Sequence, residues 1–310
     1  MKDIVIIGAG PAGLSAALYG ARAGMELEVL DSNYMAGGQV LTTYEVDNYL
    51  GLPGSNGFYM GMKFKEHVEK LGVEISSLVV EKIECVEATE HVTGHFIVHT
   101  EQEDIECKTV LLATGAVNRK LEIPGEEEFR GRGVGYCATC DGAFFRGKVT
   151  AVVGGSYQAV EDAIYLSGLC EKVYLIHRRD KLRAGAVLEE QLKKLTNVEI
   201  IWNSIPLEIT GSEAVEEVLI KNVRKEEEQK LRVDGVFVAI GTLPSTELAK
   251  GFVEMDEQGY IIAGETGETS LPGFFVAGDI RTKQLRQIVT AVADGANAVT
   301  AAWNYIEQMK

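Results

Sequence analysis

Two cysteines that stand three positions apart are the residues of this chain best suited to chemistry. Cys137 and Cys140 lie in the stretch YCATCDGAFF, and an acid, Asp141, follows directly. A C-x-x-C pair can supply half of a zinc site, close a structural bridge, or form a disulfide that opens and closes during turnover. A neighbouring carboxyl can carry a proton to or from a leaving thiol. The pair is therefore compatible with a metal site, a structural disulfide or a redox-active disulfide.

The remaining cysteines and the histidines argue against a metal. A zinc site needs two further ligands at compatible spacing, and the other three cysteines are scattered singly along the chain. His91, His95 and His99 are regularly spaced, but their surroundings predict an exposed β-hairpin face. We therefore predict no metal site and a redox-active pair, the more frequent meaning of C-x-x-C between α/β elements.

Composition narrows the class of protein further. The chain has 310 residues, a net charge of −16, and is 46% hydrophobic and 25% charged. This length predicts about two domains, and the acidic balance argues against a nucleic-acid partner. No apolar run approaches ~18 residues, so we expect no membrane span, and the first apolar run, Ile4 to Ile7, is too short for the core of a signal peptide. Scattered cysteines favour the reducing cytoplasm.

The sequence contains an internal repeat. Residues 4–16 (IVIIGAGPAGLSA) and residues 149–163 (VTAVVGGSYQAVEDA) both read as a strand, a glycine cluster and a helix. Each copy closes on a strand followed by glycine, VLLATG at 110–115 and VFVAIG at 236–241. Strand, helix and strand at this spacing predict parallel α/β units. We therefore expect an α/β fold with two Rossmann-like, three-layer ββα nucleotide-binding domains.

The second copy interrupts the first. SLPGFFVAGDI, near the C-terminus, is a buried strand without a unit of its own, so it should complete the first domain. We expect a discontinuous nucleotide-binding domain at 1–117 and 245–310, and an inserted nucleotide-binding domain with the C-x-x-C at 118–244. The chain should cross between the domains near residues 123–125 and 242–244, where proline and glycine make a plausible hinge.

The first copy carries a complete dinucleotide fingerprint. Its glycines permit a tight turn, close approach of a pyrophosphate and close packing of the helix, whose N-terminus favours phosphate. Asp31 ends the next strand, where an acid accepts a hydrogen bond from a free ribose 2′-OH, as FAD requires. The residues predicted to bind the cofactor in this first copy are Gly8, Gly10, Pro11, Ala12, Gly13, Asp31, Ala113 and Gly115.

The second copy differs at two informative places. His177, followed by Arg178, Arg179 and Arg183, replaces the acid, and arginine can pair with a 2′-phosphate. This exchange favours NADPH. The loop itself comprises Gly154, Gly155, Ser156 and Ala159, with Ser156 in place of the middle glycine and Tyr157 beside it. That exchange weakens the expected pyrophosphate contacts.

The motifs together resemble the low-molecular-weight thioredoxin reductases. YCATCDGAFF, HRRDKLR, GAGPAG, AGGQ and FVAGDIRTKQLRQIV occur in that family's order. The resemblance implies FAD in the discontinuous domain and NADPH in the inserted one. It implies that Cys140 is the thiol next to the flavin, Cys137 the thiol that attacks the partner disulfide, and Asp141 the acid/base. The residues implied for the flavin side are Gly37, Gly38, Gln39, Asn48, Gly278, Asp279, Arg286, Gln287 and Ile288.

The resemblance also implies partners and motion. NADPH would reduce FAD, reduced FAD would open the Cys137–Cys140 disulfide, and the domains would rotate between the two steps. Thioredoxin would receive the electrons, with Phe144 and Phe145 as an apolar docking patch. Members of the family are usually homodimers.

Three alternatives stay open at this point. The same fold can take electrons from ferredoxin or a flavodoxin, which the altered loop at Ser156 favours and the arginines oppose. The flavoprotein partner of alkyl hydroperoxide reductase has a related sequence, but carries an additional N-terminal thioredoxin-like segment. A redox-sensing, nucleotide-binding module without turnover is the third possibility.

Overall fold

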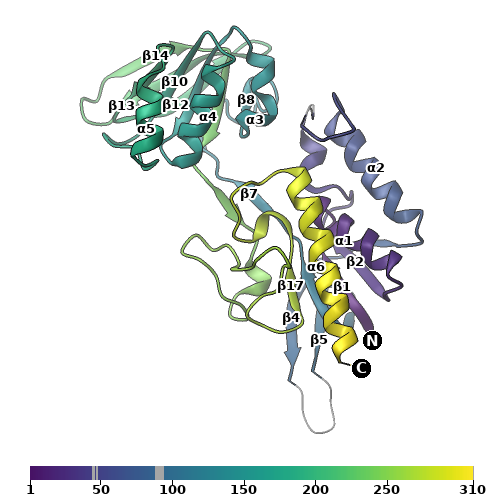
Figure 1. Cartoon of the computed structure of the whole chain (residues 1–310). Coiled ribbons are helices and arrows are strands. Elements are labelled where there is room, and N and C mark those ends of the chain that lie inside the picture. Colours follow the sequence, from purple (N-terminus) through teal and green to yellow (C-terminus); the bar gives the residue numbers. More distant parts are fainter. Residues whose placement is uncertain (44–45, 47, 88–93, 310) are drawn as a thin grey trace. The chain divides into compact units, whose positions relative to one another are not determined.

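The chain forms two compact units in the computed structural model, which describes residues 1–43, 46, 48–87 and 94–309. Unit 1 comprises Met1–Val117 and Leu243–Lys310, and unit 2 comprises Asn118–Thr242 (Figure 1). His91 of the predicted hairpin lies outside the described residues. Both units are built of parallel strands, helices and an antiparallel meander, so the predicted α/β class is confirmed.

Unit 1 is organised around a parallel sheet that β6 links to an antiparallel meander. The strand order is β3-β2-β1-β6-β5-β4, and β17 pairs with the C-terminal half of β6. The N-terminal half of β6 pairs with β5 instead, in antiparallel register. The strands are β1 (Lys2–Ile7), β2 (Leu27–Asp31), β3 (Ile75–Ser77), β4 (Val80–Val86), β5 (His95–Thr100), β6 (Asp104–Leu112) and β17 (Phe274–Val276).

Helices cover one face of this sheet and the meander covers the other. Ile4 and Ile6 of β1 belong to the cluster that includes the helices, whereas Val5 and Ile7 belong to the cluster on the opposite face. A strand buried on both faces has to be apolar throughout, which explains the run IVII. The helices and 3-10 turns are α1 (Pro11–Arg22), η1 (Gly38–Thr42), α2 (Gly57–Glu69), η3 (Glu247–Ala249), η4 (Gly278–Ile280) and α6 (Ile288–Gln308).

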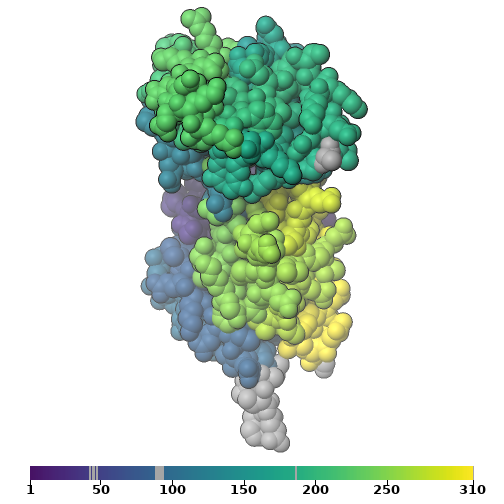
Figure 2. Space-filling view, turned by 90° about the vertical axis from the view of Figure 1, so that its left-hand side faces the viewer, coloured from purple at the N-terminus to yellow at the C-terminus, as the bar shows by residue number. Residues whose placement is uncertain are grey.

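The C-terminal segment is an integral part of unit 1. After residue 243 the chain returns, adds β17 to the sheet beside β6, and ends in α6, which packs along α1 (Figure 1). Figure 2 shows this segment, in green to yellow, spread over one face of the unit. The expectation that SLPGFFVAGDI adds a strand to the first sheet is therefore confirmed.

Unit 2 repeats the plan. Its parallel sheet has the order β11-β10-β9-β15-β8, and a separate meander has the order β12-β13-β14. Its strands are β8 (Val134–Gly135), β9 (Val149–Gly154), β10 (Lys172–Ile176), β11 (Val198–Ile201), β12 (Ser204–Gly211), β13 (Val215–Asn222), β14 (Glu228–Arg232) and β15 (Gly235–Ala239). Its helical elements are α3 (Ala138–Asp141), η2 (Gly142–Phe145), α4 (Tyr157–Ser167) and α5 (Ala186–Lys193).

The two crossings pair with each other, and the first lies at Val117–Asn118, ahead of the expected residues 123–125. β7 (Ala116–Asn118) leads out of the first part of unit 1, and β16 (Thr242–Pro244) leads back into the second part. They form a two-stranded sheet. The chain therefore passes between units as a ribbon of two paired strands.

The contact between α1 and α6 depends on a glycine. A Cβ added at Gly295 of α6 would lie 2.0 Å from the carbonyl oxygen of Ala12 in α1. Glycine at this place lets the two helix backbones meet directly, and any side chain would force them apart. The start of α1, which carries the glycine loop, is thereby fixed against α6.

We expect Gly295→Ala to lower the thermal unfolding midpoint by several degrees, because overpacking costs roughly 1–3 kcal/mol. Gly264→Ala is the matched control, since a Cβ there meets nothing within 4 Å and its φ is ordinary. Differential scanning calorimetry of both variants is the measurement. Equal midpoints for Gly295→Ala and wild type would contradict the packing argument.

Candidate functional site

The two cysteines of the C-x-x-C form a disulfide, Cys137–Cys140. Cys137 directly precedes the short helix α3, and its carbonyl accepts hydrogen bonds from the backbone N–H groups of Cys140 and Asp141, at 3.2 and 3.1 Å. This tight turn holds the two sulfurs on the same side of the chain. Both cysteines are half-buried, so a thiol partner can reach the pair.

Asp141 has the properties of a proton carrier. Burial raises the pKa of its carboxyl to about 6, because the charged form loses its hydration. Its Oδ2 packs against Gly135, where an added Cβ would approach to 3.0 Å. A carboxyl with a pKa near neutrality exchanges protons with a thiol more readily than an exposed aspartate does.

The two phenylalanines of the expected docking patch differ in exposure. Phe144 is 38% exposed. Phe145 instead packs in the core of unit 2, edge-on to Phe237 at a centroid distance of 5.3 Å. Its ring also fills the space beside Gly235, where a Cβ would approach it to 2.4 Å. Only Phe144 can therefore contribute to a surface beside the disulfide.

The first glycine loop packs directly on the neighbouring strand. A Cβ at Gly8, which has φ +104°, would lie 2.5 Å from the carbonyl oxygen of Ala113. A Cβ at Gly13 would lie 1.8 Å from the carbonyl oxygen of Gly8. Gly10 caps α1 without a side-chain hydrogen bond and Pro11 opens the helix, so the capping residue itself leaves the helix N-terminus open. Such a terminus binds phosphate.

Asp31 locks this loop in place. Its Oδ2 accepts a hydrogen bond of 2.6 Å from the backbone N–H of Ala9, and its Oδ1 accepts from the N–H of Asn33 at 2.7 Å. The acid at the end of β2 thus shapes the loop and also lies where a ribose-binding acid belongs.

A second glycine turn approaches the first. Gly37 donates to the carbonyl of Ala9 at 2.8 Å, and a Cβ at Gly38 would lie 3.0 Å from Cα of Gly10. Gly37 and Gly38 have φ values of +137° and +60°, which glycine adopts without strain. Gln39 then donates from its side chain to the carbonyl of Ala116.

Residues from the C-terminal segment join these turns in unit 1. A Cβ at Gly278 would lie 2.9 Å from Cβ of Ala12, which brings η4 against the start of α1. Gln287 caps α6 just before Ile288, and its Oε1 accepts a hydrogen bond of 2.9 Å from Asn48. The structure therefore brings together predicted residues that are far apart in the sequence.

Asp279 is the most informative member of this group. Its Oδ1 is buried and has no hydrogen-bond partner among the described residues. Arg286 lies beside it, donating to the carbonyl of Asp279 at 3.5 Å and stacking on the ring of Tyr260 at 4.0 Å. A buried acceptor without a donor is costly unless a ligand supplies one. A sugar-like hydroxyl fits this need.

The second glycine loop reproduces the first. A Cβ at Gly154 would lie 2.4 Å from the carbonyl oxygen of Ala239, the counterpart of Ala113. Ser156 has φ −82° and ψ 177°, close to the −74° and −176° of Gly10. The backbone therefore tolerates serine in place of glycine. However, the Ser156 hydroxyl accepts from the N–H of Ala159 at 3.5 Å and partly occupies the helix N-terminus.

His177 does for the second loop what Asp31 does for the first. It is 5% exposed, its Nε2 lies 3.0 Å from the carbonyl of Lys181, and a Cβ at Gly155 would approach its ring to 2.1 Å. Burial lowers the pKa of His177, so the neutral imidazole is favoured. The buried ring of His177 therefore packs against Gly155 and supports the loop.

The arginines that follow are exposed. Arg178, Arg179 and Arg183 lie on the surface, and the backbone N–H of Arg183 donates to Gly155 at 2.8 Å. Within the described residues, none of the three guanidinium groups forms an ion pair with a carboxylate. They are available to a phosphate beside the second loop.

The residues present fit both cofactors. Unit 1 offers two apposed glycine turns, an open helix N-terminus and the unpartnered Asp279 oxygen, which suits a dinucleotide with a polyhydroxyl chain. Unit 2 offers a glycine loop of the same backbone shape with arginines close by, which suits a nucleotide that carries an additional phosphate.

Sequence reasoning missed two buried networks. In unit 2, the carboxylate of Glu126 accepts hydrogen bonds from the N–H groups of Leu121 and Glu122 and from the hydroxyl of Tyr136. In unit 1, Asp294 of α6 holds Arg281 and Lys283. An acid on the small-residue face of an apolar helix, between Ala291 and Ala298, was the available signal for the second network.

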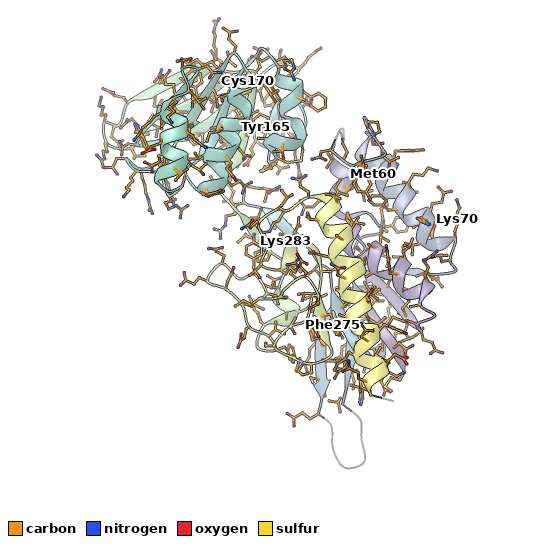
Figure 3. All side chains as sticks on the ribbon, in the orientation of Figure 1. Met60, Lys70, Tyr165, Cys170, Phe275 and Lys283 are labelled. Carbon is orange, nitrogen blue, oxygen red and sulfur yellow. A yellow bond between two sulfur atoms is a disulfide. The ribbon has the colours of Figure 1, made fainter. Side chains whose placement is uncertain are left out.

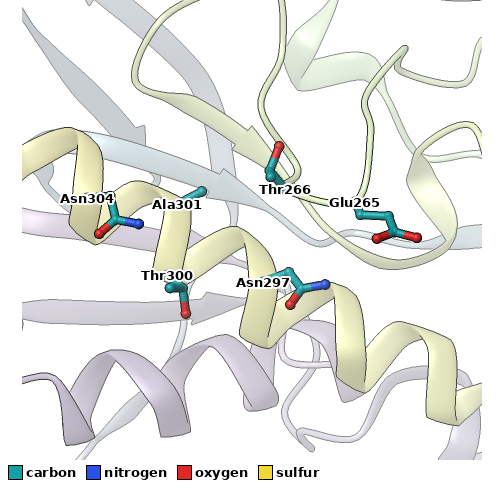
Figure 4. Close-up of a pocket in the computed structure, with 6 residues that line it drawn as sticks. All are labelled: Glu265, Thr266, Asn297, Thr300, Ala301 and Asn304. Atoms are coloured by element: carbon teal, nitrogen blue, oxygen red, sulfur yellow. The ribbon is translucent and has the colours of Figure 1, made fainter.

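Other features of the described chain point to no further chemistry. A surface pocket between α6 and a preceding loop is lined by Glu265, Thr266, Asn297, Thr300, Ala301 and Asn304, none of which was predicted to bind a cofactor (Figure 4). Among the described residues, no three His, Cys, Asp or Glu side chains cluster as metal ligands. None of the helices in the described ranges has the length and apolar character needed to cross a bilayer.

Comparison with known proteins agrees with this geometry. Residues 2–295 match the family model of pyridine nucleotide-disulphide oxidoreductases. The chain is 42% identical to a thioredoxin reductase of Peptoclostridium acidaminophilum, over 98% of this chain and 97% of that protein. It is 41% identical to a 34.2 kDa protein in the rubredoxin operon of Clostridium pasteurianum, over 98% and 97%.

A solved structure extends the similarity to three dimensions. The crystal structure of thioredoxin reductase from Streptococcus pyogenes matches with a TM-score of 0.89 at 42% identity, over 99% of each chain. The resemblance to thioredoxin reductases, whose family uses FAD and NADPH, is thereby confirmed. This chain belongs to the pyridine nucleotide-disulphide oxidoreductase family.

Proposed function

We propose that the chain is an NADPH-dependent flavoprotein that reduces the disulfide of a thioredoxin-like protein. The observation that carries this proposal is the Cys137–Cys140 disulfide, half-buried and followed by an acid whose pKa is raised to about 6. The two glycine loops and the names of the relatives support the cofactors and the substrate. The discontinuous unit would hold FAD and the inserted unit NADPH.

The exchange chemistry belongs to the two thiols. When bound, the cofactors supply the two electrons that open the Cys137–Cys140 bond. Cys137, as thiolate, then attacks one sulfur of the partner disulfide and forms a mixed disulfide, and the displaced partner sulfur leaves as a thiolate. Cys140 attacks Cys137, which restores the enzyme disulfide and releases the second partner sulfur. Asp141 delivers or removes protons at these sulfurs.

Several expectations remain predictions of this proposal. The homodimer, the cytoplasmic location and a rotation of one unit relative to the other follow from the family resemblance. The retention of three free cysteines, Cys85, Cys107 and Cys170, agrees with a reducing compartment.

The two cysteines should have different roles. We expect Cys140→Ser to trap a thioredoxin-like partner as a mixed disulfide through Cys137, because the resolving thiol is missing. Cys137→Ser should not trap it. Both variants should lose disulfide reduction by several orders of magnitude, because a relay of two thiols fails with one. Non-reducing gels and a turnover assay measure the two effects.

Cys85→Ser is the matched control, because Cys85 is a free, partly exposed thiol. It should keep full activity. Trapping by Cys137→Ser and not by Cys140→Ser would reverse the two roles, and full turnover in either variant would remove the relay.

Asp141 should set a pH dependence. Its pKa of about 6 means that the carboxyl holds its proton below that pH and loses it above. The rate of thiol–disulfide exchange in the wild type should therefore rise as the pH increases through about 6, because the ionised carboxylate can remove the proton of the attacking thiol. Asp141→Asn should lose this inflection and react roughly a hundredfold more slowly. Stopped-flow mixing of the reduced enzyme with a partner disulfide is the measurement. Glu190→Gln, an exposed carboxyl-to-amide change in unit 2, should leave the profile intact.

The identity of the electron donor is the remaining question, because Ser156 favours a protein donor whereas Arg178 and Arg179 favour NADPH. A charge-assisted contact to a 2′-phosphate is worth about 1.5–3 kcal/mol, which gives a roughly ten- to hundredfold preference for NADPH over NADH. Changing Arg178 and Arg179 to alanine together should reduce the preference for NADPH over NADH, mainly because NADPH binds less tightly. Exposed Arg146 and Arg232, changed to alanine together, form the control pair.

Anaerobic bleaching of the flavin by each donor decides whether NADPH or an electron-transfer protein reduces this enzyme. The partial occupation of the α4 N-terminus by the Ser156 hydroxyl favours a second candidate, in which the same enzyme accepts electrons from ferredoxin or a flavodoxin. Bleaching by either protein, with no bleaching by NADPH or NADH, would establish the second candidate.

A further inference from the structure

A buried ionic network stands behind Asp279 in unit 1. Asp294 is 6% exposed, and its two carboxylate oxygens accept hydrogen bonds from Arg281, Lys283 and the backbone N–H of Gly278. Lys283 is labelled in Figure 3, in the loop that leads to α6. Asp294 therefore fixes the turn that carries Asp279, because it binds Gly278, the residue before Asp279, and the cations of Arg281 and Lys283.

Lys283 connects this network to Asp279. Its side chain is 6% exposed, and its Nζ lies 2.9 Å from Oδ2 of Asp294 and 3.9 Å from Oδ1 of Asp279. That Asp279 oxygen is the buried one without a hydrogen-bond partner in the described chain. The Lys283 ammonium group thus attracts the Asp279 carboxylate electrostatically, but at this distance it does not donate a hydrogen bond to Oδ1.

We propose that Lys283, held by Asp294, is a positioning residue that keeps Asp279 ionised and aimed to receive a hydroxyl of FAD. This inference deepens the proposed function and rests on it, because FAD is the ligand. Lys283 acts through Asp279 and not by contact with the cofactor.

The charges around Asp279 support this role. Burial raises the pKa of the Asp279 carboxyl, while Lys283 and Arg286 lower it and Asp294 raises it. Removal of the Lys283 ammonium therefore raises the pKa further and favours the neutral acid. A hydroxyl donates a stronger hydrogen bond to a carboxylate than to a neutral carboxyl group. FAD should accordingly bind less tightly wherever Asp279 is protonated.

The experiment compares FAD binding by the apoprotein forms of wild type and Lys283→Met between pH 6 and 8.5, followed by flavin fluorescence. The dissociation constant of the variant should exceed that of the wild type about tenfold at pH 6, and about threefold at pH 8.5. Lys250→Met, which removes an exposed lysine of the same unit, should match the wild type at every pH. Lys283→Arg keeps the charge and should retain the wild-type pH profile.

A double-mutant cycle separates positioning from general loss of structure. In an Asp279→Asn background the side chain cannot ionise, so Lys283→Met should change FAD binding by less than about twofold at any pH. A loss that is equal at all pH values, or that persists in the Asp279→Asn background, would overturn the inference, as would unchanged binding. If Lys283→Met does not fold by circular dichroism, Lys283→Gln takes its place.

The wild-type protein distinguishes this inference from the proposed function. A wild type that takes up no FAD would refute the flavoprotein assignment itself. A wild type that binds FAD, together with a Lys283→Met variant of the same affinity and pH profile, would refute the role of Lys283 alone.

Discussion

The close approach of a glycine turn to the carbonyl of the neighbouring strand is the contact on which both units depend. At Gly8 and Gly154 an added Cβ would lie 2.5 and 2.4 Å from the carbonyl oxygens of Ala113 and Ala239. Only glycine permits this approach, and it sets the start of α1 and α4 over the C-terminal ends of the parallel strands. Asp31 and His177 then secure the two loops from the next strand.

The rest of the flavin-side site follows from how the chain completes unit 1. Residues 278–287 are separated from residues 8–13 and 37–39 by the whole inserted unit, and they join these turns because β17 returns to pair with β6. The contact of Gly295 with Ala12 and the burial of Asp294 then fix the turn that carries Asp279. The cofactor site is therefore complete only when the C-terminal segment has folded onto the first part of unit 1.

Much of this architecture was readable in the sequence, for definite physical reasons. The repeat of strand, glycine turn and helix predicted both parallel sheets, because glycine and β-branched residues mark these elements strongly. The burial of Phe145 and the packing of His177 were not readable, because each depends on a partner distant in sequence, Phe237 or Gly155. The network of Asp294 with Lys283 likewise appears only when the loop folds back onto α6. Sequence patterns therefore located the loops together with Asp31 and His177, but not the contacts by which these side chains hold the loops.

The central claim is that electrons from NADPH reach the Cys137–Cys140 disulfide within this chain. Its most direct test is anaerobic incubation of the FAD-loaded protein with NADPH, followed by alkylation under denaturing conditions and peptide mass mapping. We expect Cys137 and Cys140 to become alkylated only after NADPH is added, while Cys85, Cys107 and Cys170 are alkylated with or without it. A Cys137–Cys140 disulfide that stays closed after NADPH has been added would show that NADPH is not its reductant.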